Sequence, residues 1–281
     1  MRRDYQLVVL IFMCFSLHVA AALCPDANHP DLVKSWARSA REKDKQLCRS
    51  DIKWMGTLLY SNANLYESKV EGASGEIIRQ KEIHSQLAKT RSPLQICESG
   101  FNAGHSAVSW LLAAPHAKYQ GFDAGELFHK YPRKNMELLQ LLFGKERVQV
   151  EFGDSRNTLL EFAKRRTTNR TVVGTFVCDL IHVDGGHFED VPYKDLANFR
   201  HIADRSTLLV MDDINCDPRS CLFPKSGCRV PMMEWAAATQ GPNPWIREVE
   251  CHNFRGESAG KDGGECRGHC NGKSVNCRTT L

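Results

Sequence analysis

The 281-residue sequence has no concentrated basic region. Its 37 basic and 33 acidic residues are interspersed, and the net charge is only +4. The one basic cluster, Lys164-Arg165-Arg166, is too short for a nucleic-acid-binding face, so we expect no nucleic-acid partner. The Gly-x-Gly-x-x-Gly pattern of dinucleotide-binding folds is also missing. A hydrophobic content of 42% excludes a disordered chain and suffices for one substantial core.

The apolar run at the N-terminus is at the short limit for a membrane span. Two arginines at positions 2–3 precede it, it extends over residues 7–17, and small residues follow at 20–22. This order of basic, apolar and small residues predicts a secretory signal peptide, residues 1–23, cleaved near Ala22. We therefore expect a secreted or luminal protein with no stable membrane span after cleavage.

A signal anchor is the alternative interpretation of this segment, although Ser16 and His18 interrupt the apolar run. A bacterial lipoprotein fits less well, because Leu23 rather than a small residue precedes Cys24.

Twelve cysteines, of which only Cys14 lies inside the predicted signal, are typical of an oxidising compartment. Cys97 and Cys178 fall in predicted core strands, and we interpret them as buried thiols rather than bridge partners. Cys24 and Cys48 are also outside the signal. Disulfides are expected within a C-terminal set: Cys216, Cys221, Cys228, Cys251, Cys266, Cys270 and Cys277.

The sequence motifs also bear on a zinc site and on glycosylation. A zinc site is conceivable near the C-terminus, but its spacings fit no common zinc finger and disulfides are favoured. Its ligands would be Cys266, His269, Cys270 and Cys277. The sequence Asn169-Arg170-Thr171 is the only glycosylation sequon, and it lies in a polar loop.

The segment 94–106 has the pattern of a strand, a tight loop and the start of a helix. Glu98 follows four residues of strand character, and Gly100 and Gly104 come before an apolar helical run at 107–114. Glycine lets a loop backbone approach a ligand closely, and the helix N-terminus presents free N–H groups. The Gly-x-x-x-Gly spacing with an acid at the strand end favours S-adenosylmethionine over a diphosphate. An ordinary strand-to-helix turn is the alternative.

The remaining pattern predicts an α/β fold. Residues 26–92 are expected to be helical, with helices at 31–46 and 74–89 forming a cap. After the glycine loop, strands and helices alternate, which predicts a doubly wound, mostly parallel sheet with helices on both faces. The expected strands are 118–122, 148–152, 176–183 and 207–211, and the expected helices are 135–143, 158–164 and 193–201.

Polar residues follow these strands at the edge where ligands bind in such sheets. They are Glu98, Asp123, Asp154 with Ser155, Asp184, and Asp212 with Asp213. Five strands that each end in an acid are hard to attribute to loop composition alone.

Together these motifs, from about residue 70 to 214, resemble the class I S-adenosylmethionine-dependent methyltransferases. The resemblance is strongest to small-molecule O-methyltransferases of the catechol O-methyltransferase type and to relatives with a methyltransferase-24 domain. It is carried by Glu98-x-Gly-x-x-x-Gly-x-Ser106, Gly121-Phe122-Asp123, Gly153-Asp154-Ser155, and the segments 179–187 and 209–214. It implies a Rossmann-like, seven-stranded, mostly parallel sheet. The expected division is a signal peptide (1–23), a helical cap (24–92), the methyltransferase domain (93–255) and a Cys-rich tail (256–281).

The resemblance implies a role for each motif residue. Residues of the first loop would contact the methionine part of S-adenosylmethionine, Asp123 the ribose hydroxyls, and Asp154 and Ser155 the adenine. The implied cofactor-binding set is Glu98, Gly100, Phe101, Asn102, Gly104, Ser106, Asp123, Asp154, Ser155 and Asp184. For Ser106 a plain helix-capping role is an equal alternative, and for Phe101 packing is favoured over stacking.

A divalent cation is the second implied cofactor. Asp184, Asp212 and Asp213 are the candidate ligands for Mg²⁺ or Ca²⁺, which prefer oxygen ligands. The cation would orient a hydroxyl of a small acceptor, with His187 as the candidate base and Asp184 beside it. The alternative is that Asp212 caps a turn and that His187 bonds to a nearby carboxylate.

Two other functions remain open at this point. A nicotinamide-dependent oxidoreductase shares the strand–helix alternation and an acid on the second strand. A secreted relative that kept the fold but lost turnover would bind a cofactor or ligand only. The sequence leaves the acceptor and the oligomeric state open.

Overall fold

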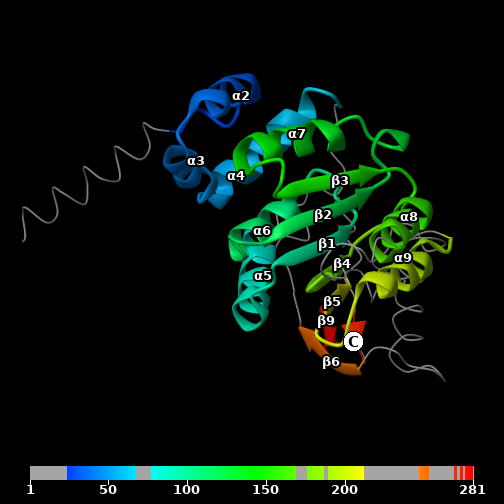
Figure 1. The fold of residues 1–281 in the computed structure, drawn as a ribbon. Coiled ribbons are helices and arrows are strands. Elements are labelled where there is room, and N and C mark those ends of the chain that lie inside the picture. The colour runs from blue at the N-terminus through cyan, green and yellow to red at the C-terminus, as the bar shows by residue number, and fades with distance from the viewer. Residues whose placement is uncertain are drawn as a thin grey trace, which may run out of the picture.

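The computed structural model describes residues 24–67, 77–168, 176–186, 189–211, 247–252, 269–270, 273–274 and 276–280. Helices lie on both sides of a central sheet (Figure 1). Within the described ranges, no helix has both the length and the apolar character needed to cross a membrane.

The described chain begins with helices and then alternates between strands and helices. The helices are α2 (Pro30–Ser39), α3 (Glu42–Arg49), α4 (Ile52–Asn64), α5 (Ile77–Arg91), α6 (His105–Ala113), α7 (Pro132–Phe143), α8 (Ser155–Thr168) and α9 (Val191–Phe199), with short 3₁₀ turns η1 (Gly125–Leu127) and η2 (Arg200–Ile202). The strands are β1 (Gln95–Ser99), β2 (Lys118–Asp123), β3 (Val148–Phe152), β4 (Leu180–Val183), β5 (Leu208–Met211), β6 (Arg247–His252), β7 (His269–Cys270), β8 (Lys273–Ser274) and β9 (Asn276–Thr280).

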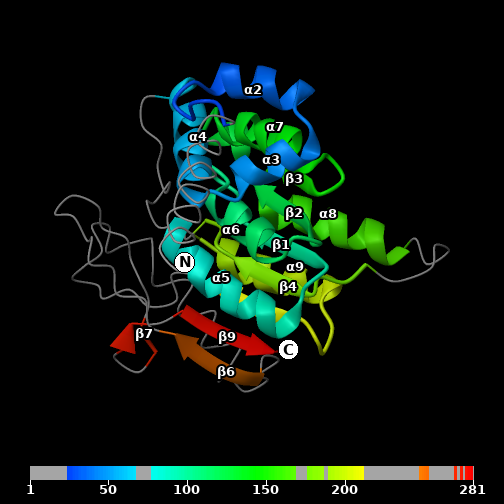
Figure 2. The same ribbon diagram turned by 90° about the vertical axis from the view of Figure 1, so that its left-hand side faces the viewer.

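The predicted parallel α/β sheet is confirmed for five strands, which lie in the order β3-β2-β1-β4-β5. Beyond β5 the sheet continues with β9 and β6, both joined by antiparallel pairing. Figure 2 shows this pair at the end of the molecule opposite α2. Because β1 lies at the centre, its carboxyl end borders the ends of β2 and β4 directly.

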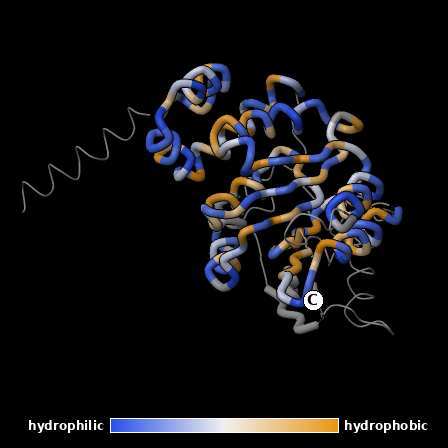
Figure 3. Tube along the Cα trace, viewed as in Figure 1, coloured by the Kyte–Doolittle hydropathy of each residue, from blue (hydrophilic) through white to orange (hydrophobic). Residues whose placement is uncertain are grey.

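Alternate residues of the central strands β1, β4 and β5 face two separate cores, as expected for a sheet covered on both sides. Ile96, Leu180 and Leu208 pack in the core beneath α5, α6 and α7. Cys97 and Ile181 pack in the other core with residues of α8 and α9. Figure 3 shows the resulting apolar stretches in the central strands and the mixed character of the helices.

The N-terminal helices differ from the expected arrangement at one point. The single helix predicted for 31–46 is wrong, because α2 ends at Ser39 and the extended backbone of Ala40 and Arg41 separates it from α3. α3 then lies against the C-terminus of α7. There Lys45 and Arg49 donate to the carbonyl oxygens of Leu141 and Leu142, at 3.3 and 2.7 Å. Cations at this end of a helix satisfy its free carbonyls.

Two disulfides connect described residues. The interpretation of Cys97 and Cys178 as thiols is wrong, since they form a disulfide that joins β1 to the segment before β4. Both are fully buried, so burial alone does not separate a core thiol from a core disulfide. Cys24 and Cys48 form the second disulfide, which ties the segment before α2 to α3.

Several predictions concern residues outside the described ranges. These are the signal peptide (1–23), the sequon Asn169-Arg170-Thr171, and Cys266 of the conceivable zinc set. Most cysteines of the C-terminal set also lie outside, and only Cys251, Cys270 and Cys277 fall within described strands. The proposed domain boundaries stay predictions.

Candidate active site

The glycine loop after β1 requires glycine for reasons of space as well as conformation. Gly100 has φ +92°, and its N–H donates to the carbonyl of Phe122 at 2.8 Å. A Cβ at Gly100 would overlap the backbone carbonyl of Asp184, which follows β4. At Gly104, which has φ +85°, a Cβ would lie 2.9 Å from the Phe101 ring. The loop is therefore held between the ends of β2 and β4, and a side chain at Gly100 is excluded.

Glu98 is fully buried in the core beneath α5 and α6. Its register partner on β4 is His182, whose Nδ1 lies 2.5 Å from Glu98 Oε1. The hydroxyl of Tyr119 donates to Glu98 Oε2. Burial and the neighbouring Glu98 raise the pKa of Tyr119 well above its usual value, so the hydroxyl stays protonated as a donor. Both oxygens of Glu98 are thus engaged inside the protein, and its predicted contact with methionine stays a prediction.

Glu98, His182 and Asp184 place three potential metal-ligand atoms within 4.8 Å of one another. Two ligand atoms around one ion at about 2 Å lie roughly 3 Å or more apart, however. The 2.5 Å contact between Glu98 and His182 is shorter than this, so this geometry is a hydrogen-bonded pair and not a preformed cation site.

Asp123, at the end of β2, is connected to the glycine loop. One carboxylate oxygen accepts from the Asn102 N–H at 2.7 Å, and the other accepts from the Gly125 N–H at 2.6 Å. Burial raises the pKa of Asp123, and these two hydrogen bonds oppose the shift. Asn102 itself has φ +46° and accepts from the Tyr131 hydroxyl at 2.7 Å. The loop and the end of β2 therefore form one hydrogen-bonded unit.

The other residues of the loop lie mostly inside the protein. Phe101 is buried in the core beneath α6, consistent with the favoured packing role. Ser106, in the first turn of α6, is also buried. His105 begins α6 and forms a hydrogen bond with the backbone of Gly56 in α4. This contact links the loop to the N-terminal helices.

Burial of His105 predicts a stability that depends on pH. Desolvation lowers its pKa from 6.5 to about 4, so the folded state resists protonation that the unfolded chain accepts. Stability from this group is complete above pH 6.5 and is lost as the pH falls towards 4. We expect the wild type to lose on the order of 3 kcal/mol relative to His105→Asn over this interval. Urea unfolding of both proteins between pH 7 and 4 measures the difference, and a constant difference would contradict it.

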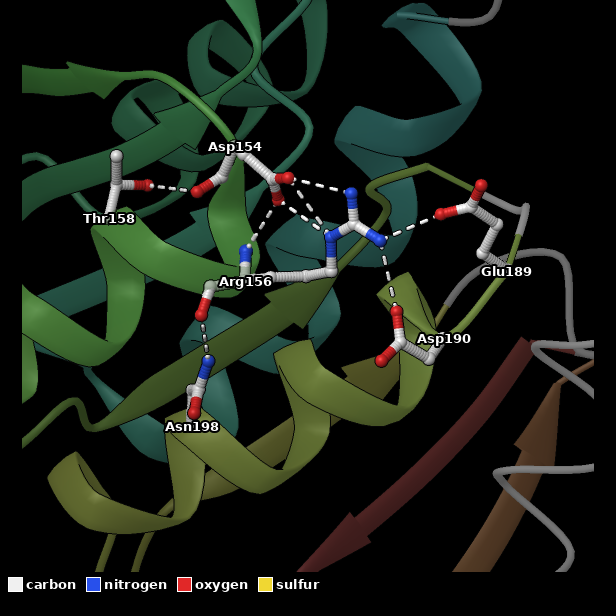
Figure 4. Close-up of polar contacts among 6 residues, drawn as sticks. All are labelled: Asp154, Arg156, Thr158, Glu189, Asp190 and Asn198. Carbon is white, nitrogen blue, oxygen red and sulfur yellow. Dashed lines mark hydrogen bonds and ion pairs between the residues drawn. The ribbon is translucent and has the colours of Figure 1, made fainter.

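Asp154, at the end of β3, is paired with Arg156 (Figure 4). The guanidinium lies 2.7 Å from Asp154 Oδ2 and extends to Glu189 and Asp190 at 2.8 and 3.1 Å. Arg156 holds the pKa of Asp154 below its usual value. An adenine contact by Asp154 would therefore be made by a carboxylate that already binds a guanidinium. Ser155 begins α8 directly after it.

The predicted metal ligands are only partly within the described residues. Asp184 follows β4, and its N–H donates to the Ser99 carbonyl at 2.9 Å. Val183 pairs with Met211, the last described residue of β5. Asp212, Asp213 and His187 lie outside the described ranges.

Sequence reasoning missed Tyr119 and His182, which hold Glu98. Gly121 leaves room for the Tyr119 ring, because a Cβ at position 121 would lie 3.0 Å from that ring. The signal in the sequence is His182 within the otherwise apolar strand β4. Tyr119 gives no comparable signal, because β2 also contains Lys118 and Gln120. The convergence of Tyr119 and His182 on Glu98 depends on the strand order, which local periodicity does not specify.

A family model described as "Methyltransferase domain" matches residues 97–214. The match begins within β1 and covers the glycine loop, Asp123, Asp154 and Asp184. It also extends over Asp212 and Asp213. No curated protein matches the sequence.

Solved methyltransferase structures share the fold at low sequence identity. The cofactor-bound Rv0187 from MTB is 15% identical, with a TM-score of 0.54 over 81% of this chain and 89% of that one. The O-methyltransferase from Bacillus cereus in complex with SAH is 13% identical, with a TM-score of 0.51 over 82% and 90%. The SAH-bound methyltransferase PaMTH1 from Podospora anserina is 16% identical, with a TM-score of 0.50 over 79% and 87%. Residues 97–214 thus match the model of a methyltransferase domain, and the chain shares the fold of solved methyltransferase structures.

Proposed function

We propose that this protein is an S-adenosylmethionine-dependent methyltransferase that methylates a hydroxyl group of a small acceptor with the help of a divalent cation. The observation that carries the proposal is the sheet edge itself. Asp123 ends β2, Asp154 follows β3 and Asp184 follows β4, in a sheet where β1 lies between β2 and β4. All three carboxylates remain partly exposed at the edge that holds the left-handed Gly100 loop. Ligands of parallel α/β sheets bind at this edge.

The residues of this edge fit the cofactor. The loop at 100–104 has glycines at both ends, so its backbone is open to a ligand at the edge of the sheet. The Asp123 carboxylate beside it accepts two backbone hydrogen bonds and has further lone pairs that can accept from ribose hydroxyls. Asp154 and Ser155 would border the adenine. When bound, S-adenosylmethionine supplies a methyl group on a positively charged sulfur. The acidic edge favours that charge, and the role of the chain is to orient the acceptor towards it.

Replacement of Asp123 tests the cofactor site. Asp123→Ala is expected to weaken S-adenosylmethionine binding by about 1.5–3 kcal/mol, the contribution of a hydrogen bond to a charged group. Asp123→Asn, which retains one acceptor oxygen, should weaken binding less. Isothermal titration calorimetry measures both affinities.

Asp31→Ala is the matched control for this test, because Asp31 is an exposed acid in the first turn of α2. It should bind the cofactor like the wild type. Unchanged affinity in a folded Asp123→Ala variant would remove Asp123 from the site.

The cation would be held by Asp184, Asp212 and Asp213. The pairing of Val183 with Met211 supports this, because Asp184 and Asp212 are the next residues along two neighbouring strands. Three carboxylates at one edge would repel one another without a cation, and Mg²⁺ or Ca²⁺ suits oxygen ligands. His187 follows Asp184 by three residues, and a neutral imidazole there would accept the proton of the acceptor hydroxyl near pH 7.

Metal removal tests this part of the proposal. Methyl transfer to a panel of hydroxylated acceptors should stop on chelation with EDTA and return when Mg²⁺ or Ca²⁺ is added. Asp212→Asn should reduce both metal binding and turnover while S-adenosylmethionine still binds. Full activity in EDTA would show that the metal-assisted mechanism is wrong.

The described disulfides support a secreted or luminal location, since both would be unusual in a reducing cytosol. We also propose that β9 and β6 complete the family's seven-stranded sheet and that residues 256–281, which include β9, form a Cys-rich tail. The helices α2–α4 would cap the domain and contribute to acceptor recognition.

A secreted, non-catalytic relative is the second candidate, and the same disulfides favour it, because the supply of cofactor outside the cytosol is uncertain. Such a protein would bind S-adenosylmethionine in calorimetry without turnover on the acceptor panel. The methyltransferase match weighs against the oxidoreductase alternative.

A further inference from the structure

A buried carboxyl group that takes no part in the proposed reaction lies next to the candidate site. Asp195, in the middle of α9, is fully buried. Among the described residues, neither of its carboxyl oxygens has a hydrogen-bond partner of ordinary geometry. Burial raises the pKa of Asp195 to about 7, although the nearby hydroxyls of Ser155 and Ser99 lower it. A buried polar group of this kind calls for a structural or functional reason.

The surroundings of Asp195 suggest that reason, because it lies where three loops of the site meet. Ser99 ends β1 just before the glycine loop, and Ser155 begins α8 just after the β3 turn. Gly185 belongs to the loop after β4. A Cβ at Gly185 would lie 2.7 Å from Asp195 Oδ2 and 3.3 Å from Ser99 Oγ. Asp195 therefore packs directly against the loop after β4, beside the serines of the other two.

Other residues of α9 hold the same turn after β3. Asn198, one helical turn beyond Asp195, donates to the Arg156 carbonyl at 3.1 Å. At the beginning of the helix, the guanidinium of Arg156 contacts Glu189 and Asp190 (Figure 4). Arg156 also pairs with Asp154. The residues just before α9 and Asn198 near its end therefore both contact the turn after β3, and Asp195 lies between these two contacts along the helix.

We propose that Asp195 is a positioning residue that sets the loops after β1, β3 and β4 in the relative positions needed to bind S-adenosylmethionine. The inference rests on the proposed function. Asp195 acts through Ser99, Ser155 and Gly185 and does not itself touch the cofactor. Ser99 Oγ, like both oxygens of Asp195, has no partner of ordinary geometry among the described residues. Rotation of the two serine side chains would let each hydroxyl donate to the carboxyl group, which would make it a common acceptor for two loops.

The test is calorimetric titration of the purified protein with S-adenosylhomocysteine, together with thermal unfolding. Asp195→Ala removes the common acceptor, and we expect binding weaker by roughly tenfold or more. Asp195→Asn retains size and an acceptor oxygen, and should recover affinity to within about threefold of the wild type. In turnover assays, KM for S-adenosylmethionine should rise more than kcat falls.

Lys194→Ala is the matched control, because this neighbouring residue of α9 is exposed and should leave affinity unchanged. If Asp195→Ala does not fold, Ser99→Ala provides the second test, since it removes one hydroxyl with little change in volume. We expect several-fold weaker binding from it. Wild-type affinity in folded Asp195→Ala, or in Ser99→Ala, would overturn the inference. Failure of the wild type to bind S-adenosylhomocysteine would instead overturn the proposed function, and this inference with it.

Discussion

Gly100→Ala is expected to reduce the free energy of unfolding by roughly 3–5 kcal/mol and to abolish S-adenosylmethionine binding. Gly100 has φ +92°, where an L side chain is strained, and its Cβ would overlap the backbone carbonyl of Asp184. The Asp184 carbonyl directly follows β4, so it cannot move away from a Cβ at Gly100 without displacing that strand. The loss is a large fraction of the stability of a typical domain. Urea unfolding measures the first effect and calorimetry the second.

Gly144→Ala separates the two causes of this loss. Gly144 also has a positive φ, +101°, with ψ 141°, but a Cβ there meets only the carboxylate end of the exposed Glu146 side chain. That side chain can move, so only the backbone strain of about 1–3 kcal/mol should remain. Equal losses in the two variants would show that the contact with Asp184 is unimportant.

Removal of the Cys97–Cys178 disulfide is expected to have the second largest effect. The bridge closes a loop between residues 81 apart in sequence. Loss of this constraint on the unfolded chain destabilises the native state by about 4.5 kcal/mol. The double variant Cys97→Ala with Cys178→Ala is the appropriate change, because alanine places no polar group in the core. Its urea unfolding curve gives the difference from the wild type.

The Cys24–Cys48 disulfide provides the comparison. It spans 24 residues, for which the same relation gives about 3.5 kcal/mol. The double variant Cys24→Ala with Cys48→Ala should therefore be less affected, and its cofactor affinity should stay close to that of the wild type, because the bridge lies in the N-terminal helices. Stability of the Cys97→Ala, Cys178→Ala variant equal to the wild type would contradict the predicted order.

The parallel sheet could be predicted because its signals are local. Buried strands appear as short apolar runs, and the residues that follow them, such as Gly100 and Asp184, occupy loops at one edge of the sheet. The predicted strand at 148–152 agrees with β3, residue for residue. The extended backbone at Ala40 and Arg41 was missed, since neither residue is a helix breaker.

The features that could not be predicted depend on which strands become neighbours. Cys97 meets Cys178, and Glu98 meets His182, only because β4 pairs with β1 in a fixed register. Local periodicity carries no information about contacts between residues more than 80 positions apart. Asp195 escaped notice for the same reason, because its neighbours come from three different loops.

The central position of β1 also bears on how the chain folds during synthesis. β1, β2 and β3 precede β4 in the chain, and His182 follows Glu98 by 84 residues. A nascent chain that has completed only its first three strands would bury the Glu98 carboxylate with Tyr119 but without its histidine. Such an unpaired charge is strongly unfavourable inside a core. The first half of the domain is therefore not expected to become stable until β4 leaves the ribosome and inserts beside β1, which makes this a late-assembling fold with many long-range contacts.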